Sequence, residues 1–327
     1  MQVPSRRVDP PFPSLRVDRR RRSRRRTFLV ALFAAVLAAG ALGSAAIATD
    51  TLGAGHLWER LVAKVDRFLS GPPPDRPTLA TVEVSDDPGD DGEEPAASPS
   101  PAASVAPVPS GQPTPAPTPT PPPRVAVDVD ILQNHTSVFA HEIRDDWCSP
   151  AGVTTVLAIL GLGAPTDARE KEIASRVGEW ESYQDSHNGE WGPAAMALAL
   201  DAYGAKGYEI RAYTSRRSAL RGAAAAISKT SSPAILLAWR GAHTWVMSGY
   251  RADADPVLFK DAKVSGAYIL DPWYPWNSSI WGQSDPPGTF QDAAEMERNF
   301  LPWKRPEGSY PDRDGKFIVV IPTIPRG

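Results

Sequence analysis

The sequence predicts an α+β domain over residues 125–327, with helices packed on a mostly antiparallel sheet. This region holds nine of the ten tryptophans, and about 200 residues are enough to build one well-packed core. Apolar residues recur at helical spacing up to residue 203 and mostly at strand spacing after it. Helices followed by a run of strands are typical of α+β architecture.

The expected elements follow from this periodicity and from the residues that bound each segment. Alternation predicts a strand over 124–132. Val153, Val156 and Leu157 share one face of a predicted helix over 148–161, with Pro150 in its first turn. Helices are also predicted over 167–180, 191–203, 216–229 and 291–300, and strands over 208–213, 233–239, 244–250, 267–270 and 316–322.

The first 48 residues indicate membrane targeting. Residues 1–26 contain ten arginines, and residues 27–48 form an apolar stretch without a charged residue. This stretch is long enough to span a bilayer, and the arginines would stay on the cytoplasmic side. We therefore expect a single-pass cell-membrane protein whose domain is extracytoplasmic. A cleaved signal and a secreted protein stay open, because R-R-T-F-L at 25–29 resembles a twin-arginine motif and A-I-A at 46–48 a signal-peptidase site.

Two segments separate this targeting element from the domain. Residues 49–70 predict a juxtamembrane stalk. Residues 71–124 hold 17 of the 35 prolines, eight acidic residues and no aromatic residue, a composition typical of disordered chain with polyproline II character. We expect this Pro-rich linker to act as a spacer that lifts the domain off the membrane.

Charge and motifs exclude several functions. Residues 125–327 contain 20 Lys and Arg against 25 Asp and Glu, which argues against nucleic-acid partners. The chain has one cysteine and therefore no intrachain disulfide. It contains no C-x-x-C, H-E-x-x-H or G-x-x-x-x-G-K-[ST] sequence, so we expect no cofactor and no metal.

That single cysteine, Cys148, falls where a loop becomes a helix. The unpaired N–H groups and positive dipole end of a helix N-terminus favour a thiolate. Outside the cytoplasm one unpaired thiol offers no structural advantage and is exposed to oxidation. We interpret Cys148 as a nucleophile, against the alternative that it is a small buried residue.

Two further residues complete a candidate site. His243 begins the strand A-H-T-W-V-M-S-G-Y, and Asp271 ends the strand before Pro272. If these strands pair, the imidazole and the carboxylate meet at one edge of the sheet. A thiolate, an imidazole that exchanges the proton and a carboxylate that orients it form a nucleophilic triad.

Three strings in this order resemble C39-like cysteine peptidases of the papain fold. They are W-C-S-P-A-G-V-T-T-V-L-A-I-L-G, A-H-T-W-V-M-S-G-Y and I-L-D-P-W, and the resemblance spans about residues 145–275. It implies a papain-like fold with an N-terminal helical lobe packed on an antiparallel sheet. It also implies Cys148 as nucleophile, His243 as general base and acid, and Asp271 as the orienting residue.

The sequence departs from that family at the oxyanion hole. Papain-like enzymes supply a donor from a glutamine about six residues before the cysteine, where this chain has Glu142. A carboxylate cannot donate when ionised. Gln133, fifteen residues before Cys148, is our candidate donor if the intervening loop folds back. Ser149 also replaces the usual glycine, and a long insertion separates His243 from Asp271.

These features predict a membrane-tethered, extracytoplasmic cysteine peptidase or amide hydrolase that acts through a thioester. Its expected substrate is a peptide or protein, with cell-wall peptide as one option. A transglutaminase-like enzyme and a cell-wall amidase keep the same triad and stay open. A non-catalytic papain-fold binding module on a stalk is the alternative from a different class.

Overall fold

A computed structural model describes residues 65, 68, 69, 71–85, 122–186, 191–278 and 280–326. The predicted segments 1–26 and 27–48, most of the stalk and residues 86–121 of the linker lie outside these residues. Within the described ranges, no helix has both the length and the apolar character that crossing a bilayer requires. The prediction of a membrane span therefore remains a prediction.

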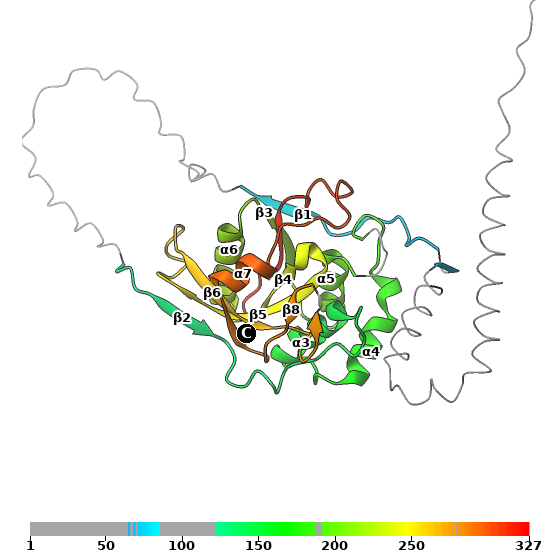
Figure 1. Cartoon of the computed structure of the whole chain (residues 1–327), viewed down its shortest axis with the longest axis horizontal. Helices are drawn as coiled ribbons and strands as arrows, with labels where there is room; N and C mark the ends of the chain where they lie inside the picture. The colour runs from blue at the N-terminus through cyan, green and yellow to red at the C-terminus, as the bar shows by residue number, and fades with distance from the viewer. Residues whose placement is uncertain are drawn as a thin grey trace, which may run out of the picture. The chain divides into compact units, whose positions relative to one another are not determined.

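The centre of the domain is an eight-stranded sheet with the order β1-β3-β10-β4-β5-β6-β9, to which β2 adds beside β5 (Figure 1). Every pairing is antiparallel except that of β1 with β3. The strands are β1 Thr81–Val84, β2 Val127–Asp130, β3 Tyr208–Tyr213, β4 Ala234–Ala238, β5 His243–Ala252, β6 Val264–Leu270, β9 Thr289–Asp292 and β10 Phe317–Pro322. A separate two-stranded sheet pairs β7 (Asn277–Ser278) with β8 (Gly282–Gln283).

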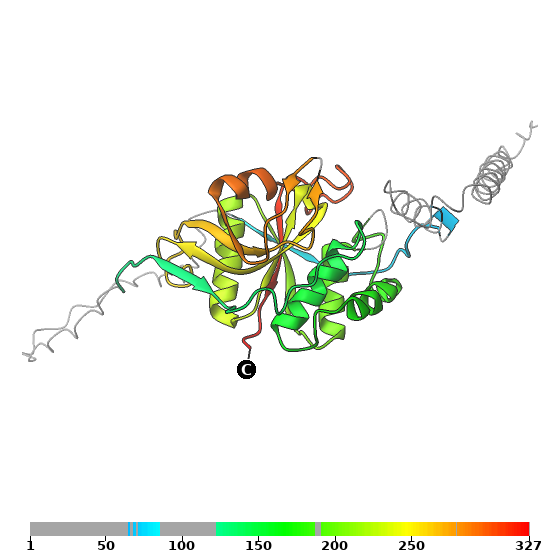
Figure 2. The same cartoon turned by 60° about the horizontal axis from the view of Figure 1, so that its bottom comes forward.

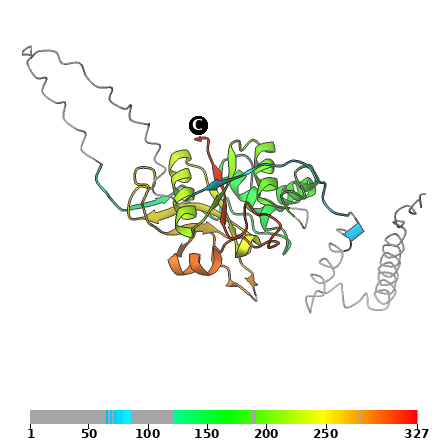
Figure 3. The same cartoon turned by 90° about the horizontal axis from the view of Figure 1, so that it is seen from above.

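Helices cover both faces of the sheet. They are α3 Cys148–Ile159, α4 Asp167–Ser175, α5 Pro193–Ala202, α6 Arg216–Thr230 and α7 Ala293–Asn299, with short 3₁₀ turns η1 Val177–Glu179 and η2 Trp239–Gly241. The helices α3 and α5 pack on one face, and α6 lies on the other (Figures 2 and 3). Side chains alternate between the faces, as in β4, where Ile235 and Leu237 face α3 and α5 while Leu236 faces α6. This arrangement confirms the predicted α+β class with helices on a largely antiparallel sheet.

The start of the Pro-rich linker was predicted wrongly. Residues Pro72–Gly327 belong to one compact unit, and β1 within the predicted linker pairs in parallel with β3. Side chains add to this attachment, because Arg76 donates to the carbonyls of Gly178 and Glu181, and Lys316 pairs with Glu83 at 2.6 Å. The composition of residues 71–124 gave no sign of β1, because this four-residue strand is stabilised by pairing with the edge of the sheet at β3.

The N-terminal half of α3 lies unusually close to the start of β5. A Cβ atom placed on Gly152 would lie 2.5 Å from Cγ2 of Thr244, so the helix and strand approach each other only because residue 152 has no side chain. Val153, Val156 and Leu157 are almost fully buried against the sheet on this face. The contact sets the first residue of α3, Cys148, beside the first residues of β5.

Candidate active site

Cys148 occupies the N-terminus of α3, as the sequence predicts. Trp147 is the N-cap, and its side chain makes no capping hydrogen bond, nor does the first turn contain an acidic residue. The first N–H groups of a helix have no partner within the helix, and here no capping side chain takes that place. The half-buried thiol of Cys148 therefore lies at the positive end of the helix dipole.

His243 and Asp271 meet at one end of the sheet. Leu270, the last residue of β6, lies opposite Val246 of β5, so Asp271 and His243 are at the same end of these two strands. Nε2 of His243 lies 2.6 Å from Oδ1 of Asp271, and the side chains are 2% and 9% exposed. If Nε2 donates to the carboxylate, the lone pair of Nδ1 is left to face the thiol.

The protonation of Cys148 and His243 is coupled. Burial by itself would raise the pKa of Cys148, but the hydrogen bond and charge of His243, with help from Thr244, bring it below its ordinary value. Burial would likewise lower the pKa of His243, yet Asp271 and the thiolate of Cys148 raise it well above its ordinary value. The site therefore favours a thiolate–imidazolium pair over a neutral thiol and imidazole.

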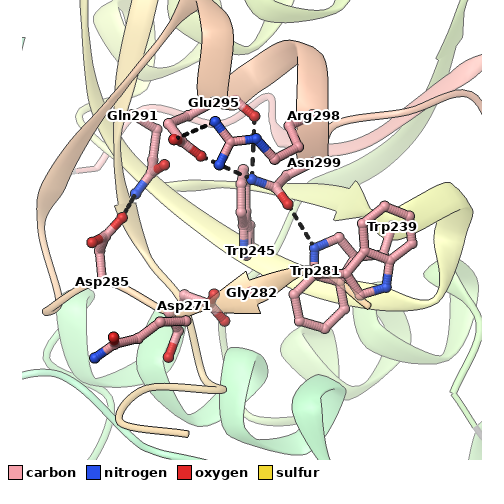
Figure 4. Close-up of a pocket in the computed structure, with 12 residues that line it drawn as sticks. Trp239, Trp245, Asp271, Trp281, Gly282, Asp285, Gln291, Glu295, Arg298 and Asn299 are labelled. Atoms are coloured by element: carbon pink, nitrogen blue, oxygen red, sulfur yellow. Dashed lines mark hydrogen bonds and ion pairs between the residues drawn. The ribbon is translucent and has the colours of Figure 1, made fainter. Parts of the chain in front are cut away.

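Tryptophans cover the imidazole. The Trp239 ring stacks on His243 with centroids 4.0 Å apart and an interplanar angle of 17°, and Trp281 stacks on Trp239 at 5.7 Å. Nε1 of Trp239 donates to Oδ1 of Asn299 at 3.0 Å, which fixes the indole (Figure 4). Sequence analysis missed this role, because it depends on a left-handed backbone at Trp239, whose φ is 50°. The aromatic cover limits the access of water to the imidazole–carboxylate pair.

A pocket opens on the Asp271 side of these tryptophans. Trp239, Trp245 and Trp281 supply apolar walls, while Glu295 and Arg298 of the α7 helix supply charged groups (Figure 4). These residues come from β5, the turn after β4, the β7–β8 hairpin and α7. The pocket lies next to the candidate triad and offers both aromatic and charged surface for a bound group.

The structure adds Glu142 to the predicted residues. One oxygen of Glu142, the sulfur of Cys148 and a ring nitrogen of His243 all lie within 4.8 Å of one another. Burial raises the pKa of Glu142 to about 10, and the negative charges of Cys148 and Asp271 act in the same direction against the opposing effect of His243. The carboxyl group is therefore neutral at neutral pH. The three atoms are also close enough to surround a metal ion.

Gln133 is our candidate oxyanion donor. It follows β2 with an exposed side chain, and within the described part of the chain it makes no hydrogen bond to the three triad residues. The assignment of Gln133 as the donor therefore stays a prediction, while the structure places an oxygen of Glu142, which we had set aside as ionised, within 4.8 Å of the sulfur.

No family model and no curated protein matches this chain. Among solved structures, the chain is similar to one described as a double glycine motif protease from an AMS/PCAT transporter in complex with the leader peptide. The match covers 57% of this chain and 91% of that chain, with 18% sequence identity and a TM-score of 0.29.

Proposed function

We propose that this protein is a cysteine peptidase or closely related amide hydrolase that forms a thioester at Cys148. The observation that supports this most is the placement of His243, whose Nε2 lies 2.6 Å from the carboxylate of Asp271 and whose ring has a nitrogen within 4.8 Å of the Cys148 sulfur. A nucleophile, a base and a residue that orients the base are the parts that acyl transfer requires. Their burial behind Trp239 fits a site that works with limited access of water.

The chemistry follows from the charges of the ion pair. The Cys148 thiolate attacks the carbonyl carbon, a C–S bond forms, and the carbonyl oxygen becomes an oxyanion. The His243 imidazolium gives its proton to the leaving nitrogen as the C–N bond breaks, which leaves a thioester. His243 then takes a proton from water, which attacks the thioester and restores the thiolate and imidazolium. Asp271 keeps the ring oriented and stabilises its positive charge throughout.

The location and substrate are part of this proposal. The arginine-rich segment and the apolar stretch over residues 27–48 support attachment to the cell membrane with the domain outside the cytoplasm. A net negative domain disfavours nucleic acid and leaves a peptide or protein as the substrate class. The Pro-rich segment between the apolar stretch and the domain gives reach toward extracytoplasmic peptides, including those of a cell wall.

A cleavage assay with the full-length protein in detergent tests the proposed reaction. We expect cleavage of members of a mixed peptide library, seen by mass spectrometry as new termini, and no cleavage with Cys148→Ala. Incorporation of a labelled amine into a glutamine-containing protein would indicate a transglutaminase instead, and release only from peptidoglycan would indicate a wall amidase. Absence of all three reactions, with a thiol no more reactive than free cysteine, would leave the binding module.

A further inference from the structure

Glu142 presents to the thiol a carboxyl group that is buried and unpaired. Glu142 is 1% exposed, and among the described residues neither of its carboxyl oxygens has a hydrogen-bond partner. Buried polar groups nearly always have a partner, and an unpaired one costs stability. The Glu142 carboxyl group lies within 4.8 Å of Cys148 Sγ. It is therefore available to form a hydrogen bond with a substrate atom that reaches the sulfur during the reaction.

The backbone around Glu142 is held from three sides. Three hydrogen bonds, each 3.0 Å long, tie this segment to α3, to the turn after β6 and to α4. They run from Ala140 N–H to Thr155 Oγ1, from Glu142 N–H to the Pro272 carbonyl and from Ile143 N–H to Glu170 Oε1. The position of the carboxyl group is therefore fixed before any substrate binds, which is the condition for an effective electrostatic donor.

The surroundings keep this carboxyl group protonated. The titratable groups that face it are Cys148 of α3, His243 of β5, Asp271 after β6 and Glu170 of α4. Burial is the main cause that raises the pKa of Glu142 to about 10, and only His243 among these groups opposes it. A protonated carboxyl group has one O–H to donate, and a carboxylic acid held neutral in an apolar site is a known oxyanion donor in another enzyme class.

We propose that Glu142, as the neutral carboxylic acid, donates a hydrogen bond to the oxyanion formed when Cys148 attacks a carbonyl carbon. The backbone N–H of Cys148, at the uncapped start of α3, is the second donor. The proton stays on Glu142, so the charge of the oxyanion is stabilised without proton transfer. This inference rests on the proposed acyl-transfer function and assigns its missing component.

The geometry at the sulfur agrees with this role. The carbon that carries the oxyanion is bonded to Cys148 Sγ, so the oxyanion is separated from the sulfur by one atom. A donor should lie about 2.7–3.1 Å from the oxyanion. A carboxyl oxygen within 4.8 Å of the sulfur can meet that requirement. An ionised Glu142 would instead repel the oxyanion.

Two reagents distinguish stabilisation of the oxyanion from reactivity of the thiolate. Acylation of Cys148 by p-nitrophenyl acetate forms a C–S bond, passes through an oxyanion and releases p-nitrophenolate. Alkylation by iodoacetamide displaces iodide at a saturated carbon and forms no oxyanion. Both rates are measured on the full-length protein with EDTA present, for wild type, Glu142→Gln and Glu142→Leu, with Cys148→Ala as background.

We expect Glu142→Leu to lower the acylation rate by about 10²–10³-fold while the alkylation rate changes by less than about threefold. Glu142→Gln should keep acylation within about tenfold of wild type, because its amide N–H₂ donates in the same place. Both variants should fold, because they replace a neutral group that has no hydrogen-bond partner to lose.

The pH profile gives a second readout that a purely structural role would not change. Acylation by wild type should fall as pH rises through about 10, where Glu142 ionises, and Glu142→Gln should lack this decline. Glu170→Gln is the matched control, because it removes a neighbouring buried carboxyl group, whose pKa burial raises to about 8, and keeps an acceptor for Ile143. The acylation rate of Glu170→Gln should still decline near pH 10.

Equal acylation by wild type and Glu142→Leu, with fast alkylation in both, would overturn this inference and leave the proposed function standing. A metal ion that copurifies with wild type before EDTA is added, and that is absent from Glu142→Leu, would show that the carboxyl group is a ligand and would overturn the inference as well. Slow alkylation and slow acylation in wild type would instead contradict the proposed function, and this inference with it.

Discussion

His243→Ala is expected to lower kcat/KM for peptide cleavage by about 10³-fold or more. The variant loses the base that holds the thiolate and the acid that protonates the leaving nitrogen, and general acid–base catalysis alone contributes about 10²–10⁴-fold. The measurement is the initial rate of cleavage of one library peptide at pH 7, with circular dichroism to show that the variant is folded. Asp271→Ala should also be slower than wild type, because Nε2 of His243 loses its acceptor.

The chain contains a matched control for this variant. His135 and Asp130 form a second histidine–carboxylate pair, with Nε2 and Oδ2 2.7 Å apart and both side chains partly buried. The single cysteine, Cys148, pairs with His243 and not with this pair. His135→Ala should therefore keep kcat/KM within about threefold of wild type. Equal losses in His135→Ala and His243→Ala would show a general structural effect and would remove the evidence for a catalytic imidazole.

Asp185→Ala is expected to lower the free energy of unfolding by about 3–5 kcal/mol. Asp185 is fully buried, accepts hydrogen bonds from the N–H groups of Ala194 and Ala195 at the start of α5, and pairs with Arg313 at 2.9 Å. Arg313 is itself 2% exposed. The variant therefore leaves a buried guanidinium with only the more distant, half-exposed Asp312 at 3.7 Å as a counter-charge, and it removes the acceptor for the first N–H groups of α5.

Urea unfolding followed by tryptophan fluorescence measures this loss. The exposed pair of Arg176 and Glu179, 2.7 Å apart, provides the control, and Glu179→Ala should cost no more than about 1 kcal/mol. If Asp185→Ala cost as little as Glu179→Ala, the buried pair would not be what holds α5. Because α5 and α3 share one core, loss of this pair should also lower the catalytic rate at temperatures where unfolding begins.

The periodic elements could be predicted from the sequence. The predicted helix over 148–161 corresponds to α3, and the predicted strands over 208–213 and 316–322 correspond to β3 and β10, with ends within two residues. These segments bury one face or both, and burial imposes a regular spacing of apolar residues. By contrast, β1 and β9 are four residues long and derive their order from the neighbouring strand, so their own sequence carries little signal. Residues 291 and 292 were predicted as helix but end β9.

The candidate site was predictable in part. The three triad residues lie at the ends of helices and strands that the apolar spacing predicts. The motifs and the expected ends of these elements therefore indicate the same residues, Cys148, His243 and Asp271. The raised pKa of Glu142 could not be predicted from the sequence, because the segment that carries this residue is buried against α3, α4 and the turn after β6 together. Gln133 was chosen only for its amide group, without any information on the path of the loop. The position of Trp239 over the imidazole depends on a left-handed backbone at this residue. Such a backbone is uncommon for a residue other than glycine, so the sequence does not indicate it.

The pH dependence of Cys148 alkylation by iodoacetamide tests the central claim most directly. The thiolate is the reacting species, and His243 lowers the pKa of Cys148 while its own pKa is raised. The ion pair should therefore form below the ordinary thiol pKa of about 8.5 and persist above the ordinary imidazole pKa. We expect the wild-type rate to rise at acidic pH and stay level through neutrality, and the rate of His243→Ala to rise only near the ordinary thiol value. A wild-type profile that coincides with that of His243→Ala would contradict the thiolate–imidazolium pair.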